Sequence, residues 1–138
     1  RQRTSLPFVM DENIDGLPIL LRAHSDDAMD VVNIKISKFG GLTKAKQARD
    51  LCVNLGIALT VEDSWGGDIV TATSAHVAAS IKERSLLSVS FMNDWIREHI
   101  AGHNPCSKNG FGHVPTGPGL GIEVDLSLLE EPLFNVGP

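Results

Sequence analysis

Residues 6–41 read LPFVMDENIDGLPILLRAHSDDAMDVVNIKISKFGG, and the rest of the predicted fold is arranged around this stretch. A short apolar run ends at two acidic residues, Asp11 and Glu12. After a helical interval, a second apolar run over residues 31–36 carries one lysine, Lys35. A carboxylate at the end of one strand, next to an ammonium group in the following strand, is how barrel enzymes place a metal ligand beside a base.

The composition is that of an ordinary globular chain. It has 138 residues, of which 42% are hydrophobic and 21% charged, enough for one modest domain with a core. The formal net charge is −5 and the Lys and Arg residues are scattered, which argues against a nucleic-acid or anionic-membrane partner. No apolar run approaches the roughly 20 residues that span a bilayer, and no secretory signal is visible.

The two cysteines, Cys52 and Cys106, are far apart in the sequence. We expect both to be free thiols in a reducing compartment. The expected location is therefore the cytoplasm, or the mitochondrion if the source is eukaryotic. The sequence does not begin with Met, so we expect it to start inside a longer protein.

Strand and helix patterns alternate along residues 1–100. Continuous apolar runs predict buried strands and helical spacing of apolar residues predicts amphipathic helices. The predicted strands are residues 7–10, 31–38, 57–61 and 86–91, and the predicted helices are residues 13–28, 43–55 and 69–81. Thr43 is the predicted N-cap of the second helix, Gly56 its stop, and Asp68 the cap of the third. A final extended piece is expected at residues 121–126.

Side-chain alternation places functional groups on one face of the predicted sheet. In the second strand, Asn33, Lys35 and Ser37 share a face that is opposite to the apolar one. Lys38 falls on the other face, and we predict a structural or solvent-facing role for it. Charged groups end each of the four strands, at Asp11, at Lys35, at Glu62 with Asp63, and at Asp94. Four such units form either a small open sheet or half of a (β/α)8 barrel, and functional groups at every strand end favour the barrel.

Alternatives remain open for several of these residues. Alternation pairs Glu62 with Thr60, whereas Asp63 shares a face with apolar neighbours, so Glu62 is slightly favoured for substrate contact and both are kept. Trp65 could stack on a substrate ammonium group or pack under its loop, and packing is the simpler hypothesis. His76, in the Ala-rich helix, is predicted to be a packing residue.

The region after residue 100 changes character and is rich in His, Asn, Gly and Pro. The residues that invite a zinc site are His99, His103, Cys106 and His113. Their spacing matches no standard zinc finger, so a plain loop is predicted. The glycines of residues 117–121 precede no helix with Lys-Ser/Thr, which excludes a P-loop.

Three motifs together resemble a known family. They are Met10-Asp11-Glu12, Asn33-Ile34-Lys35-Ile36-Ser37 followed by Gly40-Gly41-Leu42-Thr43, and Pro118-Gly119-Leu120-Gly121-Ile122-Glu123-Val124-Asp125. In order and spacing they resemble the C-terminal half of the mandelate racemase/muconate lactonizing branch of the enolase superfamily, over residues 6 to about 126. The resemblance implies an α/β fold, the C-terminal half of a (β/α)7β barrel, in residues 1–100. It implies that residues 101–138 return towards a capping domain, and that the chain is a fragment or half of an enzyme.

The resemblance also implies roles for individual residues. Asp11 is the third metal-binding carboxylate and Glu12 its supporting neighbour, and Lys35 is the acid/base lysine. Glu62, Asp63, Trp65 and Asp94 lie where substrate-contacting groups are expected. Mg²⁺ is the implied cofactor, with Mn²⁺ possible, and a small carboxylate is the implied substrate of a protein that forms homo-oligomers.

The implied reaction removes the proton from the carbon beside a carboxylate, and a divalent cation stabilises the resulting enediolate. Burial and the nearby cation are expected to lower the pKa of Lys35. The segment of residues 62–68 is similar to members that act on proline-type amino acids or their betaines, so a racemase or epimerase is predicted. A dehydratase of a hydroxylated acid or hydroxyproline is the alternative, and a non-catalytic half-barrel that binds a partner is the alternative of another class.

Overall fold

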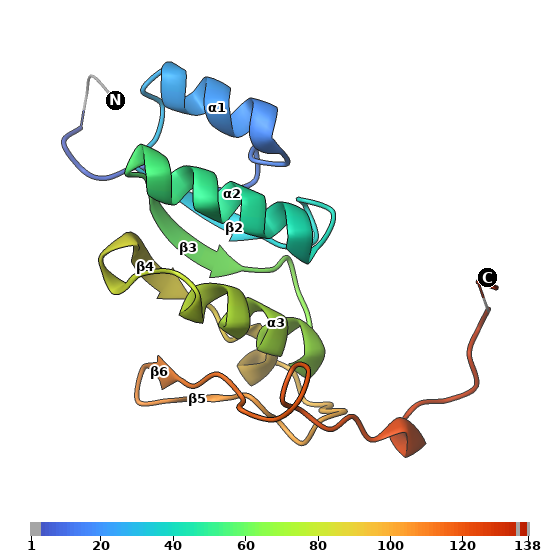
Figure 1. Cartoon of the computed structure of the whole chain (residues 1–138). Coiled ribbons are helices and arrows are strands. Elements are labelled where there is room, and N and C mark those ends of the chain that lie inside the picture. The colour runs from blue at the N-terminus through green and yellow to red at the C-terminus, as the bar shows by residue number, and fades with distance from the viewer. Residues whose placement is uncertain (1–3, 135, 138) are drawn as a thin grey trace.

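The centre of the computed structural model, which describes residues 4–134, 136 and 137, is a four-stranded sheet. The strands lie in the order β1-β2-β3-β4, and each neighbouring pair is parallel (Figure 1). These strands are β1 (Val9–Met10), β2 (Val31–Lys35), β3 (Ala58–Glu62) and β4 (Leu86–Val89). The helices between them are α1 (Leu17–Ser25), α2 (Leu42–Leu55) and α3 (Asp68–Ala79).

All three helices cover the same face of the sheet, as Figure 1 shows. Each strand pairs with the next one in the chain, and right-handed crossovers then put every helix on one side. This arrangement is the wall of a (β/α) barrel, since a doubly wound sheet carries helices on both faces. The predicted α/β half-barrel with parallel strands is confirmed.

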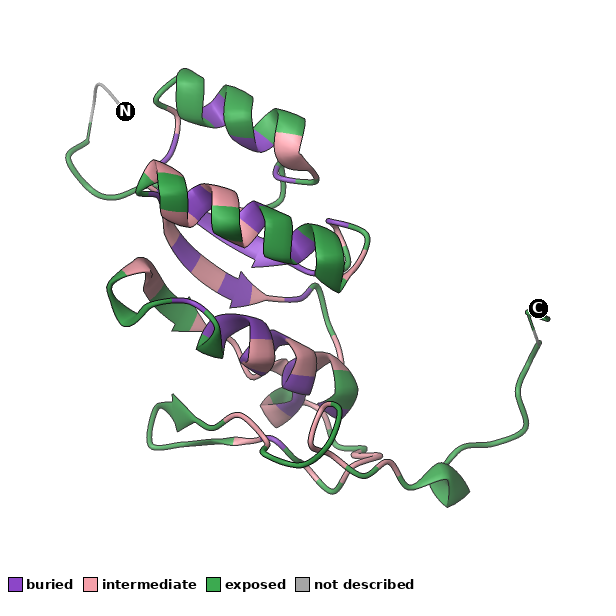
Figure 2. Ribbon diagram, in the orientation of Figure 1, coloured by how far each residue is buried: buried purple, intermediate pink, exposed green. Residues whose placement is uncertain are grey.

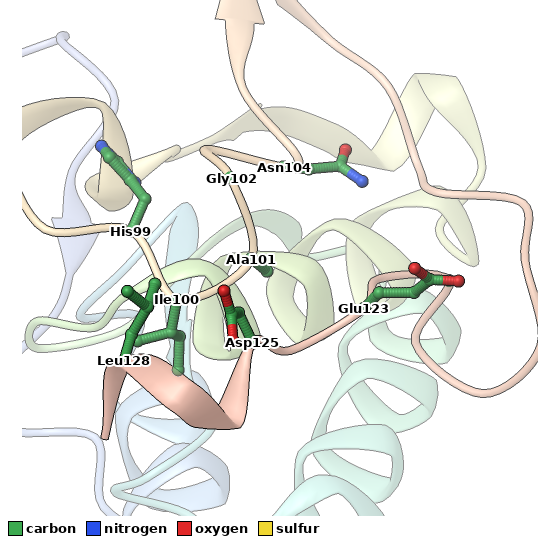
Figure 3. Close-up of a pocket in the computed structure, with 9 residues that line it drawn as sticks. His99, Ile100, Ala101, Gly102, Asn104, Glu123, Asp125 and Leu128 are labelled. Atoms are coloured by element: carbon green, nitrogen blue, oxygen red, sulfur yellow. The ribbon is translucent and has the colours of Figure 1, made fainter. Parts of the chain in front are cut away.

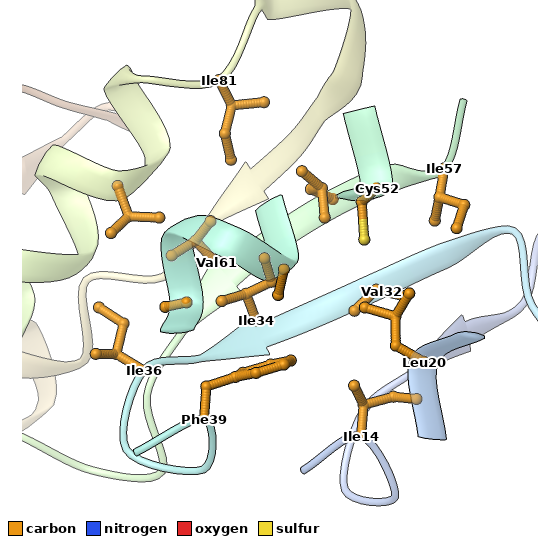
Figure 4. Close-up of a cluster of buried hydrophobic side chains, with 14 of the residues drawn as sticks. Ile14, Leu20, Val32, Ile34, Ile36, Phe39, Cys52, Ile57, Val61 and Ile81 are labelled. Atoms are coloured by element: carbon orange, nitrogen blue, oxygen red, sulfur yellow. The ribbon is translucent and has the colours of Figure 1, made fainter. Parts of the chain in front are cut away.

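The core lies between the sheet and the helices. Ile34 and Val32 of β2 and Leu59 of β3 are fully buried, and they pack with residues such as Leu20 of α1 (Figure 4). The helices present buried stripes to the sheet and exposed residues to the outside (Figure 2). Cys52 of α2 is also fully buried in this layer, and burial raises the pKa of its thiol to about 12. Both cysteines are free thiols, as predicted.

The element ends differ from the sequence prediction in several places. Helix α1 is shorter than residues 13–28, with Pro18 in its first turn as expected, and β2 stops at Lys35 because the chain then turns. The N-cap of α2 is Gly41, not Thr43, and no side chain caps it. Gly56 ends α2 as predicted, in the left-handed conformation with a φ of 73°.

The part after β4 consists of short elements. The 3₁₀ helices are η1 (Glu83–Ser85), η2 (Met92–Trp95) and η3 (Leu126–Leu128), and a hairpin pairs β5 (Ser107–Lys108) with β6 (Phe111–Gly112). The hairpin was not predicted, and the extended piece expected at 121–126 joins no sheet among the described residues. From η3 the chain runs away from the sheet (Figure 1). No helix in the described part of the chain is long and apolar enough to cross a membrane.

Candidate functional site

A ladder of polar side chains crosses the sheet face that is opposite to the helices. The register pairs Asn33 with Thr60, and the Thr60 hydroxyl donates to Asn33 Oδ1 at 2.8 Å. Asn33 Nδ2 in turn donates to Asp11 Oδ1 at 3.0 Å. Buried amides need such partners, because an unpaired one costs free energy. The ladder therefore fixes the Asp11 carboxylate at the carboxyl end of β1.

Lys35 is the centre of a second group on the same face. It is 5% exposed, and its Nζ lies 3.1 Å from Asp11 Oδ1 and 3.4 Å from Glu62 Oε1. Nζ also donates to Glu12 Oε1. Lys35 and Glu62 are register partners in β2 and β3, which explains why they meet. The structure thus brings together four residues that the sequence singled out.

These contacts act on the pKa values of the group. Burial lowers the pKa of Lys35, but hydrogen bonds to Glu12 and Asp11 outweigh burial, so the pKa is raised above its ordinary value. Burial thus acts in the expected direction, and the further lowering expected from a neighbouring cation stays a prediction. Hydrogen bonds from Lys35 and Lys38 lower the pKa of Glu12 to about 2.

Lys38 is a member of the same group, which corrects the prediction that it faces away from it. Its Nζ donates to Glu12 Oε2 and, at 2.7 Å, to the Glu12 carbonyl oxygen. The chain turns after Lys35, so strand alternation no longer decides where Lys38 points. Its side chain is 24% exposed, so the group remains open to solvent on this side.

Glu62 and Asp63 have different surroundings, and the difference bears on the choice between them. Glu62 lies beside Lys35 and its Oε2 accepts from the Ser90 hydroxyl at 3.1 Å. Asp63 is 7% exposed and accepts hydrogen bonds from the Ser37 backbone at 3.1 Å and the Ser64 backbone at 2.7 Å. The structure therefore brings Glu62, and not Asp63, into the Lys35 group, while substrate contact stays a prediction for both.

Trp65 follows β3 and is not packed under its loop. It is 66% exposed, and its ring lies 6.3 Å from that of Trp95, between centroids, at an interplanar angle of 58°. Trp95 is 73% exposed and was not singled out from the sequence. Its signal was its place directly after Asp94 at the end of a predicted strand, where functional residues gather.

Asp68 does not cap α3; this prediction was wrong. Gly67 is the N-cap, and Asp68 is the fully buried first residue of the helix. Its carboxylate accepts from Asn93 Nδ2 at 2.8 Å and from the Ala101 backbone at 2.9 Å, and it lies 3.0 Å from His99 Nδ1. Burial raises the pKa of Asp68, but these hydrogen bonds outweigh burial and lower it.

The carboxylate of Asp94 is also held by a histidine and by hydrogen bonds from the segment that follows η2. Its Oδ1 lies 2.7 Å from His103 Nε2, and the Ser107 backbone and hydroxyl donate to Oδ2 at 3.2 and 2.5 Å. The rings of His99 and His103 stack with their centroids 4.1 Å apart. The carboxylate of Asp94 is thus already hydrogen-bonded, and its predicted contact with substrate stays a prediction.

Two other predicted features can be placed. His76 is partly buried and its Nε2 lies 3.1 Å from the Leu120 carbonyl oxygen, which suits a packing residue. A cavity of about 600 Å³ lies between the loop around His99 and the segment before η3, which carries Glu123 and Asp125 (Figure 3). The members of the Lys35 group do not line this cavity.

Asp11 suits one position of a magnesium site. Carboxylate oxygens are the ligands that Mg²⁺ prefers, and the Asp11 side chain is 39% exposed and therefore accessible. The three carboxylates of the group outnumber its two ammonium groups, so the group favours a further cation. No group of three or more His, Cys, Asp and Glu among the described residues is arranged to hold a metal ion. Asp11 would therefore share a metal with ligands beyond those residues.

The fold and this group define a class: the carboxyl-terminal βα units of a barrel, with charged side chains at the ends of the strands. A family model described as enolase C-terminal domain-like matches residues 1–128. The chain belongs to this family, within the mandelate racemase/muconate lactonizing enzymes of the enolase superfamily.

Curated relatives and solved structures agree with this assignment. A cis-3-hydroxy-L-proline dehydratase from Roseibium aggregatum is 50% identical over 133 residues, which cover 96% of this chain and 36% of the relative. A mandelate racemase/muconate lactonizing enzyme structure from Aspergillus oryzae is 34% identical with a TM-score of 0.89, covering 97% of this chain and 37% of that one. One from Roseovarius nubinhibens, complexed with magnesium, is 30% identical with a TM-score of 0.92, covering 99% and 38%. The chain thus spans little more than a third of the length of these relatives.

Proposed function

We propose that the whole protein removes the proton beside the carboxylate of a hydroxylated proline-type amino acid and eliminates water from it. The observation that carries this proposal is the Lys35 group in a chain that is 50% identical to a cis-3-hydroxy-L-proline dehydratase. This relative supports a dehydratase, which the sequence analysis gave as the alternative. The sequence analysis itself favoured a racemase or epimerase.

Each residue of the group has a proposed role. A cation bound at Asp11 would lower the raised pKa of Lys35, and the neutral amine of Lys35 would then take the α-proton. The electrons of the broken C–H bond form the double bond to the β-carbon, and the β-hydroxyl leaves as water with the proton that Lys35 has taken up. Asp11 would hold Mg²⁺, which supplies positive charge to the substrate carboxylate. Glu12 holds Lys35 and Lys38 in place by accepting from both. Glu62 and Trp65 are proposed contacts for the substrate nitrogen.

A racemase or epimerase is a second candidate. An N-succinylamino acid racemase from Amycolatopsis is 30% identical over 138 residues, covering 94% of this chain and 35% of the relative. Both reactions begin with the same proton removal, so both would depend on Lys35. They differ in whether the substrate carries a leaving group on the adjacent carbon.

The test is α-proton exchange in D₂O with the whole protein and Mg²⁺, followed by NMR on cis-3-hydroxy-L-proline, L-proline and their betaines. We expect water loss from the hydroxyproline, and Lys35→Ala to slow exchange by about 10²- to 10⁴-fold, the usual contribution of a positioned base. Lys38→Ala is the matched control, because it removes the other ammonium group on Glu12 and keeps the base. Exchange that survives Lys35→Ala would sink the proposal, and exchange without water loss would favour the racemase.

A further inference from the structure

Trp95 is exposed in the segment that follows β4, and the proposed reaction gives it no role. It ends η2, is 73% exposed, and pairs with Trp65, which is 66% exposed. Two neighbouring indoles exposed to this extent form a concentrated aromatic surface, and such surfaces mark binding sites more often than isolated apolar residues do. The face of an indole attracts cations through its quadrupole.

A cavity connects Trp95 with the Lys35 group. Its volume is about 840 Å³, and it runs along β4 between η2 and the hairpin β5–β6. Both Trp95 and Glu62 line it, and Glu62 Oε1 is 3.4 Å from Lys35 Nζ. The hairpin closes one side, because Gly112 lies so near the Phe91 ring that a Cβ there would be 2.0 Å from Phe91 Cζ. Trp95 and the Glu62 carboxylate that contacts Lys35 therefore line one cavity.

The charge of the lining favours a cationic ligand. Glu62, Glu83 and Asp94 line the cavity, and none of the described residues that line it is a lysine or arginine. Carboxylates and an aromatic face together form the environment that binds ammonium groups. A purely anionic ligand would be repelled from this side of the site.

The backbone that carries Trp95 is anchored by the two residues directly before it. Before it, the fully buried Asn93 donates from Nδ2 to the Pro105 carbonyl oxygen at 2.6 Å and to Asp68. Asp94 is held by His103 and Ser107. Because this backbone is already held, little backbone entropy is lost when the indole binds a ligand.

We propose that Trp95 is a specificity-determining residue that, together with Trp65, binds the positively charged nitrogen of an amino-acid or betaine substrate whose α-carbon lies at Lys35. The proposal deepens the proposed function and rests on it. It names the class of substrate: a carboxylate with a secondary or quaternary ammonium group on the carbon that loses the proton.

The experiment is isothermal titration of the Mg²⁺-loaded whole protein with two ligands of matched shape, N,N-dimethyl-L-proline and cyclopentanecarboxylate. Only N,N-dimethyl-L-proline carries the cationic nitrogen. Trp95→Leu removes the aromatic face, Trp95→Phe keeps one, and Phe134→Ala is the control for loss of an exposed aromatic, since Phe134 is 77% exposed and does not line the cavity. Circular dichroism checks that each variant is folded.

We expect Trp95→Leu to weaken binding of N,N-dimethyl-L-proline about fivefold or more and binding of cyclopentanecarboxylate by less than about twofold. Trp95→Phe should restore most of the affinity, and on a turned-over substrate Trp95→Leu should raise KM more than it lowers kcat. An equal loss for both ligands, or no loss for either, would overturn the proposal. Because titration needs no turnover, selective binding without α-proton exchange would leave this inference standing while the proposed function fails. Exchange that depends on Lys35 but is unaffected by Trp95→Leu would support the proposed function and overturn the inference about Trp95.

Discussion

Ile34 and Lys35 are neighbours in β2 that point to opposite faces of the sheet. Ile34 is fully buried in the core, whereas the side chain of Lys35 lies in the polar group with Asp11. Period-2 alternation makes this division obligatory, because a shift by one residue would put the ammonium group in the core. The core and the candidate site are therefore built by the same five-residue strand.

Truncation of Ile34 should destabilise the protein strongly. Ile34→Ala leaves a cavity in a layer packed by β3, α1 and α2, and we expect the free energy of unfolding to fall by about 2–5 kcal/mol. Leu21→Ala is the control, because Leu21 is 47% exposed, and it should cost less than about 0.5 kcal/mol. Equilibrium denaturation with urea measures both. Similar losses for the two variants would contradict this account of the core.

Asp68 should make stability depend on pH in acid. Its pKa is lowered in the folded protein, so the stabilisation is present above the ordinary value of 3.8 and is lost as pH falls through the folded pKa. We expect the unfolding temperature to fall as pH decreases below about 4, and to fall less in Asp68→Asn, which is already destabilised at pH 7. Asp26→Asn is the exposed control, with a side chain that is 62% exposed. An unchanged acid profile in Asp68→Asn would contradict the role of this carboxylate.

Glu62 should matter to substrate binding more than Asp63 does. Its carboxylate lies beside Lys35 and lines the cavity that Trp95 shares, whereas Asp63 is occupied with Ser37. We expect Glu62→Gln to raise KM for a cationic substrate about tenfold, the order of a lost contact to a charged group. Asp63→Asn should instead lower stability with little change of KM. Steady-state kinetics and thermal unfolding of both variants separate the two effects, and the opposite pattern would exchange their roles.

Much of the site could be predicted residue by residue, and the exceptions have a physical reason. Alternation alone placed Asn33 and Lys35 on one face, because it needs no knowledge of distant segments. Lys38 was misplaced because the chain turns at the end of β2. The surroundings of Asp68 could not be predicted, because its partners come from the loop around Asn93 and His99, which is 25 to 31 residues away in the sequence.

At the scale of elements, strands and helices were predicted more reliably than their ends. A continuous apolar run marks a buried strand wherever its ends fall, whereas the ends depend on pairing with neighbours. Strand β1, expected over residues 7–10, pairs with β2 at Val9 and Met10. The hairpin β5–β6 was missed because its strands of two residues are too short to show a period.

Helix α2 ends at Gly56, and substitutions of this residue test the role of its backbone conformation. With a φ of 73°, Gly56 adopts the left-handed conformation. This conformation is unfavourable for any residue that carries a Cβ atom. We expect Gly56→Ala to reduce the free energy of unfolding by about 1 kcal/mol, and Gly56→Asn to cost less because Asn tolerates this region. Urea denaturation of the pair measures the difference. Equal stability of the two variants would mean that the chain ends the helix in another way.

At the scale of the whole molecule, β1 and β4 are the edges of an open sheet. Unpaired edge strands offer free backbone groups to other chains. Exposed apolar side chains accompany both edges, including Phe8 and Val9 near β1 and Leu87 of β4. We propose that the rest of the whole protein covers these surfaces, in keeping with relatives of which this chain spans little more than a third.

Expressed by itself, the 138-residue chain should therefore self-associate. We expect its apparent mass in light scattering to rise with concentration, and Leu87→Lys to reduce the rise, because a charged side chain on an edge strand opposes pairing. The exposed Leu133→Lys is the control, since Leu133 is 98% exposed but lies far from the sheet edge in sequence. If the chain is monomeric at all concentrations, its edge strands do not pair with those of other copies.

The burial of Cys52 has a practical consequence for spectroscopy. A thiol with a pKa of about 12 in a closed layer does not react with maleimides near neutral pH, whereas Cys106 is partly exposed. Within this chain a fluorophore can therefore be attached at Cys106 without mutating Cys52. Such a label lies on the same segment as the Asp94–His103 pair, between η2 and the hairpin, so energy transfer from the two tryptophans to the dye would report on movement of that segment.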